Sequence, residues 1–344
     1  MNIGTHNLDE KVFIIAELSA NHNGSLQTAL DTITAMKEAG ADAIKLQTYT
    51  PDTITIDCDN EIFTITQGTI WDKRKLYDLY AEAMTPWEWH KQLFDHAKNL
   101  GMEAFSSPFD ATAVDFLKQL DVPAYKIASF EITDIPLIEY TASKGKPIII
   151  STGIATLRDI EEALDACRRV GNTQITLLKC TSAYPADLEE MNLLTISDMI
   201  DRFGVTVGLS DHTMSIAAPI AAVALGARVV EKHFILDRSM GGADSTFSLE
   251  PSEFKVMVAA VRDTEKLRGK VTYDLSAKSL KSREFSRSLF VAEDVKEGET
   301  LTATNVRSVR PGFGMAPKYL PDILGKRFVA NMPKGTPLEW EHFR

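Results

Sequence analysis

The sequence predicts an α/β protein, a (β/α)8 TIM barrel followed by a small β-rich C-terminal domain. The first observation is that eight short apolar runs, each followed by a helix-length segment, succeed one another between residues 12 and 266. The second is that these runs are nearly continuous in apolar residues, as expected for parallel strands covered on both faces. The third is that no GxGxxG motif opens the first helix, which weighs against an open dinucleotide-binding sheet.

The first strand–helix unit has clear start and stop signals. The run VFIIAEL at 12–18 predicts a buried strand, and the cluster SANHNGS after it predicts a turn. Apolar residues at helical spacing predict a helix at 26–39, which Gly40 closes.

The second unit contains a long insertion. Its strand is expected at 43–49, and its helix at 86–100, with Pro86 in the first turn and Thr85 as the N-cap. Residues 51–84 between them predict an irregular segment. Such a long segment inside a compact domain is usually functional.

The later units repeat the alternation of an apolar run with a helical segment. The last two strands are joined by an Ala-rich segment that ends at Gly226, as in a parallel pair with a crossover helix. The expected strand–helix pairs are 103–109 with 112–120, 124–130 with 135–144, 147–153 with 157–170, 175–180 with 191–203, 205–209 with the Ala-rich segment, and 229–236 with 252–266.

Composition changes predict the domain boundaries. Residues 1–267 form the predicted catalytic barrel, and the polar, basic stretch 268–284 predicts a linker. Residues 285–344 alternate apolar and polar positions with Gly and Pro between them, which is typical of a β-rich domain. Since so small a domain has little core of its own, we expect it to pack on another surface.

The overall composition excludes some classes of function. The 344 residues are 44% hydrophobic and 25% charged, as in ordinary globular proteins, and the net charge of −11 argues against nucleic-acid binding. The most apolar stretch, 216–230, is interrupted by Pro219 and Arg228 and is too short to cross a membrane. The N-terminus lacks the apolar region of a signal peptide. We therefore expect a cytoplasmic protein without a membrane partner.

The three cysteines point to the same compartment. Cys58, Cys167 and Cys180 are odd in number and form no CxxC pattern, which suits a reducing environment and excludes a disulfide framework. Cys180 ends an apolar run, so we expect a buried thiol.

Two histidines form a candidate metal site. His212 follows the seventh expected strand and His233 lies in the eighth, so parallel pairing would bring both to the same end of the sheet. Paired imidazoles suit a borderline divalent ion. The alternative is that each is an ordinary hydrogen-bonded histidine. Neighbouring groups that could accept a hydrogen bond from a ligating imidazole favour the metal site; they are Ser210, Asp211, Glu231 and Asp244.

Charged and hydroxyl residues at the expected strand ends form a candidate anion site. In TIM barrels the reactive residues come from the carboxyl ends of the strands. Lys45, Lys126 and Lys179 lie in apolar runs, where each needs a partner or a ligand. One alternative is an internal ion pair with Glu17 or Glu131. Otherwise we expect excess positive charge that, with nearby hydroxyls, would bind a phosphate or carboxylate; these hydroxyls belong to Ser107, Ser129, Ser151 and Ser182.

Two other reactions use the same residue types. Lys126 or Lys179 could form the Schiff base of an aldolase, but nearby anions would raise the pKa of the lysine rather than lower it. A metalloprotease is disfavoured because the sequence contains no HExxH motif.

Eight ordered motifs resemble the sialic acid synthase family, which condenses phosphoenolpyruvate with an N-acetylated amino sugar. They are AELSANHNG (16–24), IKLQTY (44–49), SSPFD (106–110), YKIASFE (125–131), STG (151–153), CTSAYP (180–185), GLSDHT (208–213) and EKHF (231–234). VRPGFGM (309–315) resembles the family's antifreeze-like domain, of the β-clip type. The resemblance covers nearly the whole chain, and eight blocks in order are far more specific than any one of them.

The resemblance implies roles for particular residues. His212 and His233 would hold a divalent metal, Mn2+ before Mg2+ or Co2+, and the implied catalytic residues also include Glu17, Lys45 and Lys126. Phosphoenolpyruvate would contact the two lysines and Ser107, Ser129, Ser151, Ser182 and Ser210. Gln47, Phe109, Glu131, Tyr184 and Asp244 would complete the substrate site around the sugar and the reacting carbons. The family forms a domain-swapped homodimer, in which Arg310 of one chain would reach the sugar bound to the other.

Two departures from the family pattern indicate a branch. Members that act on N-acetylmannosamine commonly carry Thr in place of Ser107 and Asn in place of Ser182, and the stretch 68–90 also differs from theirs. The chain resembles the pseudaminic acid synthase branch, whose sugar is 2,4-diacetamido-2,4,6-trideoxy-L-altrose. Aromatic neighbours from the insertion would suit that less polar sugar. The alternatives are legionaminic acid or N-acetylneuraminic acid synthesis by the same mechanism, or a carbohydrate-binding protein on an inactive barrel.

Overall fold

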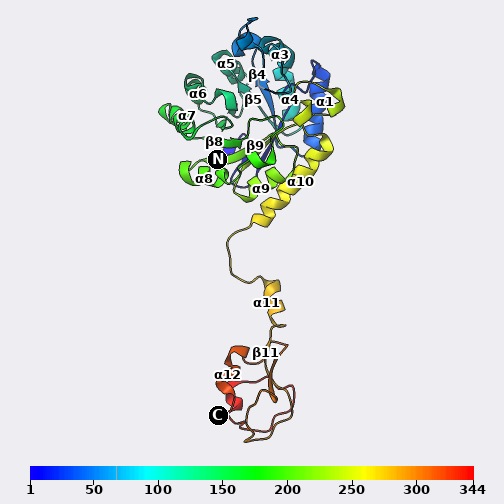
Figure 1. Ribbon diagram of the computed structural model, residues 1–344, viewed down its shortest axis with the longest axis vertical. Helices are drawn as coiled ribbons and strands as arrows, with labels where there is room; N and C mark the ends of the chain where they lie inside the picture. The colour runs from blue at the N-terminus through cyan, green and yellow to red at the C-terminus, as the bar shows by residue number, and fades with distance from the viewer. Residues whose placement is uncertain (67) are drawn as a thin grey trace. The chain divides into compact units, whose positions relative to one another are not determined.

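The computed structural model describes residues 1–66 and 68–344 (Figure 1). The chain divides into two compact units, Met1–Gly269 and Lys270–Arg344. In the described part of the chain, no helix combines the length and the apolar character that crossing a membrane requires.

The first unit is a closed barrel of parallel strands, which confirms the predicted (β/α)8 fold. Each strand pairs with the next along the chain, and the last strand pairs with the first. The buried, mostly apolar strands explain why the sequence runs lack alternation. They are β3 (Phe13–Glu17), β4 (Ala43–Thr48), β5 (Glu103–Pro108), β6 (Tyr125–Ile127), β7 (Ile148–Ser151), β8 (Ile175–Cys180), β9 (Thr206–Asp211) and β10 (Val229–His233).

Helices surround the barrel and are fixed locally by their caps. Ser25 accepts a hydrogen bond from the backbone of Thr28, and Asp110 caps the helix that follows β5 in the same way. Thr156 and Asp159 form a capping box. The helices that cover the barrel are α1 (Leu26–Glu38), α4 (His90–Asn99), α5 (Ala111–Gln119), α6 (Ile135–Ala142), α7 (Leu157–Arg169), α8 (Thr195–Phe203), α9 (Ala217–Ala224) and α10 (Pro251–Arg268). A hairpin of β1 (Asn2–Ile3) and β2 (His6–Asn7) precedes β3.

The insertion is more ordered than its sequence predicts. It contains α2 (Pro51–Ile54) and α3 (Leu76–Ala83), while residue 67 lies outside the described part of the chain. The predicted cap at Thr85 is wrong, because a 3-10 turn, Trp87–Trp89, precedes α4. The indole of Trp87 donates a hydrogen bond to the carbonyl of Tyr49 at 3.0 Å, which ties this turn to the end of β4.

The fourth strand is shorter than predicted, and this shortening moves part of the site. The run at 124–130 contains only the three residues of β6, because the chain then turns into a 3-10 helix, Ser129–Glu131. Ser129 and Glu131 therefore lie in a loop, where the side-chain directions of a strand no longer apply.

Gly208 lies where three strands of the barrel approach closely. A Cβ atom there would lie 2.5 Å from the carbonyl oxygen of Val229 and 2.7 Å from a methyl group of Leu178. Both are fixed parts of neighbouring strands. We therefore expect Gly208→Ala to destabilise the barrel by about 1–3 kcal/mol or more in urea unfolding, through overpacking. Gly171→Ala is the control, since its Cβ would meet no atom within 4 Å and only its left-handed backbone should cost about 1 kcal/mol. Equal losses in the two variants would contradict this account.

The second unit has a small β-rich core of its own. β11 (Ser288–Val291) pairs antiparallel with β12 (Val306–Val309), and isolated bridges such as Val295 to Met332 link its other segments. Its buried side chains include Leu289, Val291, Leu301, Phe328 and Leu338. The unit also contains α11 (Ala277–Arg283), within the stretch predicted to be a linker, and α12 (Leu320–Ile323).

Candidate active site

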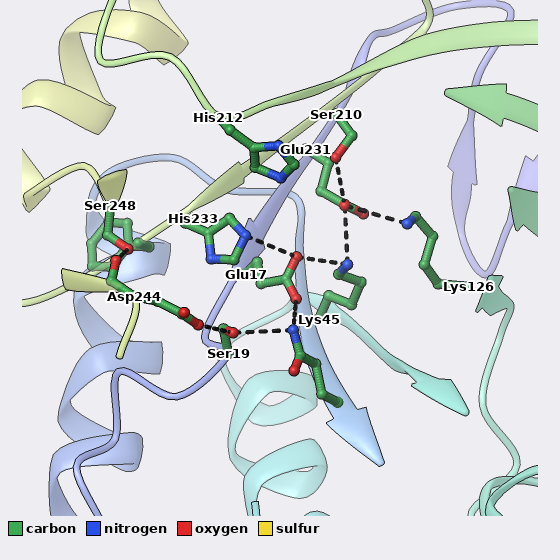
Figure 2. Close-up of polar contacts among 12 residues, drawn as sticks. Glu17, Ser19, Lys45, Lys126, Ser210, His212, Glu231, His233, Asp244 and Ser248 are labelled. Carbon is green, nitrogen blue, oxygen red and sulfur yellow. Dashed lines mark hydrogen bonds and ion pairs between the residues drawn. The ribbon is translucent and has the colours of Figure 1, made fainter. Parts of the chain in front are cut away.

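The two histidines meet at the carboxyl ends of neighbouring strands. His233 is the last residue of β10, and His212 directly follows β9. Their ring centroids are 5.4 Å apart, and both side chains are buried (Figure 2). The expectation that parallel pairing brings them to one end of the sheet is confirmed.

The surroundings of the two imidazoles fit a divalent metal ion. Nδ1 of His212 lies 3.0 Å from the carbonyl oxygen of Thr181, so this nitrogen donates its proton there, and Nε2 is the nitrogen that could bind a metal. Nδ1 of His233 is buried and has no hydrogen-bond partner among the described residues. Burial lowers the pKa of His233, which favours the neutral form that binds metals. A carbonyl behind one ring and an unpaired nitrogen on the other are typical of a ligand pair.

The two lysines of the site are held by buried carboxylates. Nζ of Lys45 lies 2.6 Å from Glu17 and 3.0 Å from Glu231, and Nζ of Lys126 lies 3.5 Å from Glu231 (Figure 2). The internal ion pair with Glu17 that we kept as an alternative is thus present. The expected excess of positive charge is wrong for this cluster, because two carboxylates balance two ammonium groups.

Glu231 is the residue that the sequence interpretation undervalued. The sequence suggests a partner for a ligating histidine, whereas in the structure Glu231 contacts both lysines and accepts a hydrogen bond from Ser210 at 3.0 Å. Burial opposes its charge, yet Lys126 and Lys45 lower the pKa of Glu231 to about 2. One signal could have found it, since Glu231 is a charged residue within an apolar run, as Lys45 is.

The predicted hydroxyl groups divide into two sets. The hydroxyls of Ser107 and Ser151 are buried and have no hydrogen-bond partner among the described residues. Ser129 accepts a hydrogen bond from the backbone of Gly153 at 3.1 Å, and a Cβ on this glycine would overlap the hydroxyl of Ser182. Buried hydroxyls without partners call for a ligand or water, since such groups are costly when unpaired.

A series of hydrogen bonds leads from Glu17, beside Lys45, to Asp244. Gln47 donates hydrogen bonds to Glu17 at 2.9 Å and to Ser19 at 3.0 Å. Ser19 in turn donates to the carboxylate of Asp244 (Figure 2). The structure thus joins Gln47 and Asp244, two of the residues expected around the sugar, through Ser19, which follows the first strand.

Aromatic side chains and Glu131 complete the surroundings. The ring of Tyr184 lies 4.4 Å from that of His212, and the ring of Phe109 lies 5.2 Å from that of Tyr49. Burial raises the pKa of Glu131 to about 7, against the effect of Lys126, and its Oε2 has no partner among the described residues. The remaining predicted residue, Arg310, belongs to the second unit.

A closed (β/α)8 barrel with this buried polar cluster at its strand ends is the architecture of a barrel enzyme. The model of the NeuB family matches residues 32–273, and the model of the SAF domain matches residues 286–344. The chain belongs to the NeuB family, whose synthases are generally metal-dependent.

Known relatives extend over the full chain. The pseudaminic acid synthase of Campylobacter jejuni is 52% identical over 100% of both chains. The N,N'-diacetyllegionaminic acid synthase of Legionella pneumophila is 38% identical over 96% of this chain and 94% of its own. The crystal structure of the N-acetylneuraminic acid synthetase from Leptospira borgpetersenii, in complex with citrate, is 30% identical. It covers 82% of this chain and 94% of its own, with a TM-score of 0.73.

Proposed function

We propose that the chain is a pseudaminic acid synthase. It condenses phosphoenolpyruvate with 2,4-diacetamido-2,4,6-trideoxy-L-altrose and releases phosphate and a nine-carbon 2-keto sugar acid. The observation that carries this proposal is the 52% identity, end to end, with the Campylobacter jejuni enzyme, against 38% with the legionaminic acid synthase. Because phosphoenolpyruvate is an intracellular metabolite, the enzyme works in the cytoplasm.

In the proposed reaction, C3 of phosphoenolpyruvate attacks the aldehyde carbon of the open-chain sugar. The aldehyde oxygen takes up a proton and becomes a hydroxyl group. Positive charge develops at C2 of phosphoenolpyruvate, where water adds and loses a proton. The C2–O bond to phosphate then breaks, and loss of the remaining hydroxyl proton leaves the ketone.

The residues at the carboxyl ends of the strands, the mouth of the barrel, have separate roles in this reaction. Lys45 and Lys126 stabilise the charges of phosphate and carboxylate, and the unpaired hydroxyls of Ser107 and Ser151 donate to the same oxygens. Glu17 is held as a carboxylate because Lys45, against the effect of burial, lowers its pKa. It positions the reacting carbons or accepts a proton from the added water.

His212 and His233 would hold the metal ion, with Mn2+ the proposed ion. Bound there, it supplies a Lewis acid that polarises the sugar's aldehyde. The neutral state of His233 and the hydrogen bond from His212 to Thr181 keep both rings ready to bind it.

Because the pKa of Glu131 is raised to about 7, we expect the binding of phosphoenolpyruvate to depend on pH. As the pH rises through about 7, its buried carboxyl loses a proton and adds a negative charge near Lys126. We expect this repulsion to raise the KM for phosphoenolpyruvate by about three- to tenfold between pH 6 and pH 8, relative to Glu131→Gln. The raised pKa of Glu131 also affects folding. The free energy of unfolding should fall as the pH rises from 4.5 to about 7, because the folded protein binds this proton more tightly than the unfolded chain does.

The measurement is the KM for phosphoenolpyruvate of both proteins across this pH range. The ratio of the two removes the ionisation of the substrate itself. Parallel profiles would show that Glu131 does not titrate near the bound anion.

We also propose a homodimer in which the SAF domain of one chain covers the barrel mouth of the other and contributes Arg310. Exposed apolar side chains on the loops after five successive strands support a protein partner at this face, since such groups are costly in water. They are Phe130, Ile154, Leu188, Met214 and Met240.

Phosphate release and product mass test the proposed function. Purified enzyme, stripped of metal, is incubated with phosphoenolpyruvate, Mn2+ and the altrose sugar, then with the manno-configured isomer and N-acetylmannosamine. Metal-dependent turnover that is fastest with the altrose sugar supports the proposal. Turnover with only another sugar would keep the reaction and change the branch. Calorimetry that shows sugar binding without phosphate release would instead favour a binding protein.

A further inference from the structure

We propose that Trp71 determines which sugar the enzyme accepts, by forming an apolar wall against the end of the sugar far from its aldehyde. This inference rests on the proposed function. Trp71 comes from the insertion, which the chain adds between β4 and α4. It would select a sugar with acetamido and methyl groups at C4 and C6 over one with hydroxyls there.

The indole of Trp71 is fixed against the loop that follows β10. Its N–H donates a hydrogen bond to the carbonyl oxygen of Ala243 at 2.9 Å. The ring lies 5.6 Å from that of Tyr184 and 6.3 Å from that of Phe247. The insertion therefore contributes one ring to a group of three that comes from separate loops of the barrel mouth.

The other two rings connect Trp71 to the histidines. Tyr184 lies 4.4 Å from His212, and Phe247 lies 5.0 Å from His233, measured between ring centroids. Tyr184 and Phe247 are themselves 5.0 Å apart. Trp71 is thus one ring further from the histidines than Tyr184 and Phe247 are, on the side where the part of the sugar remote from its aldehyde would lie.

A second aromatic residue holds the insertion in place. Tyr80 of α3 packs its ring 5.7 Å from Tyr49, which lies beside Phe109. The insertion therefore contacts the barrel mouth through Tyr80 as well as through Trp71. These contacts fix the indole in place, so the wall needs little ordering when the sugar binds.

The chemistry of the wall explains a preference. A methyl group packs against an indole face at no polar cost, whereas a hydroxyl moved there from water loses hydrogen bonds. The one polar hydrogen of Trp71 is already used by Ala243, so it offers none to a sugar hydroxyl. The wall therefore favours a C6 methyl group and penalises a C6 hydroxyl, which distinguishes the trideoxy sugars from N-acetylmannosamine.

The test compares kcat/KM for the altrose sugar and for N-acetylmannosamine in the wild type, Trp71→Ala and Trp71→Phe. We expect Trp71→Ala to lower the ratio of the two values about 10- to 100-fold, and Trp71→Phe to restore most of it. Ile70→Ala is the matched control, since Ile70 is next in the insertion and 48% exposed, and it should leave the ratio unchanged. Circular dichroism and an unchanged KM for phosphoenolpyruvate verify that the barrel is intact.

The outcomes separate this inference from the function on which it rests. A wild type that does not turn over the altrose sugar overturns the proposed function, and the wall with it. A wild type that prefers the altrose sugar, with an unchanged ratio in Trp71→Ala, overturns the role of Trp71 alone. An equal loss with both sugars also overturns it, because the ring would then support the fold of the mouth and not the choice of sugar.

Discussion

Replacing His233 with alanine should abolish Mn2+ binding and reduce synthase turnover by at least about 1,000-fold, since a Lewis acid contributes several kcal/mol to a transition state of this kind. The reason is that His233 is one of two buried imidazoles that meet at the strand ends, and its Nδ1 has no hydrogen-bond partner among the described residues. Titration of the metal-free protein with Mn2+, followed by electron paramagnetic resonance, measures the loss independently of turnover.

The matched control is His96→Ala. His96 lies on α4, where its Nε2 is 2.8 Å from the hydroxyl of Thr34, away from the strand ends. The His96→Ala variant should bind Mn2+ and turn over substrate as the wild type does. Normal turnover by His233→Ala, with the ion present, would contradict the metal site. Lost turnover with unchanged Mn2+ affinity would assign His233 to another step.

The barrel could be predicted because its signals are local. Each strand is a short apolar run, and each helix repeats apolar residues at helical spacing, so both can be recognised without knowing what they touch. The errors arose where a tertiary contact decides the structure. The hydrogen bond from Trp87 to the carbonyl of Tyr49 fixes the turn before α4, and no spacing within the sequence reveals it.

Only the part of the site that follows from the order of the strands could be predicted. Parallel pairing of β9 and β10 brings the two histidines together, and that much follows from the order of the elements. The role of Glu231 does not follow, because its contacts with Lys45 and Lys126 cross the barrel interior. Trp71 was equally hidden, since nothing in the sequence of the insertion says which loop it packs against.

A buried ion pair joins β9 and β10, the two strands that carry the histidines to the site, and its removal should have a large effect. Lys232 and Asp211 are neighbours in the register of β10 and β9, both side chains are completely buried, and Nζ lies 2.5 Å from the carboxylate. Because side chains alternate along a strand, both point away from the interior that His212 and His233 face. Asp211 also accepts a hydrogen bond from the backbone of Thr213 at 2.9 Å. Lys232 also donates a hydrogen bond to the carbonyl oxygen of Thr213. The pair therefore holds the chain on both sides of His212.

We expect Lys232→Met to cost about 3–5 kcal/mol of stability, because it leaves a buried carboxylate without its partner. It should also weaken Mn2+ binding by about 10- to 100-fold, the usual effect of removing the support of a metal ligand. Urea unfolding and Mn2+ titration of the folded protein measure the two effects separately.

The double variant Asp211→Leu with Lys232→Met distinguishes positioning from simple stability. It removes both buried charges, so most of the stability should return, since apolar replacements of a buried pair are often neutral. The anchor of Thr213 stays lost, so the weak Mn2+ binding should remain. If both variants bound Mn2+ as the wild type does, the ion pair would support only the barrel, and the position of His212 would depend on its hydrogen bond to Thr181 instead.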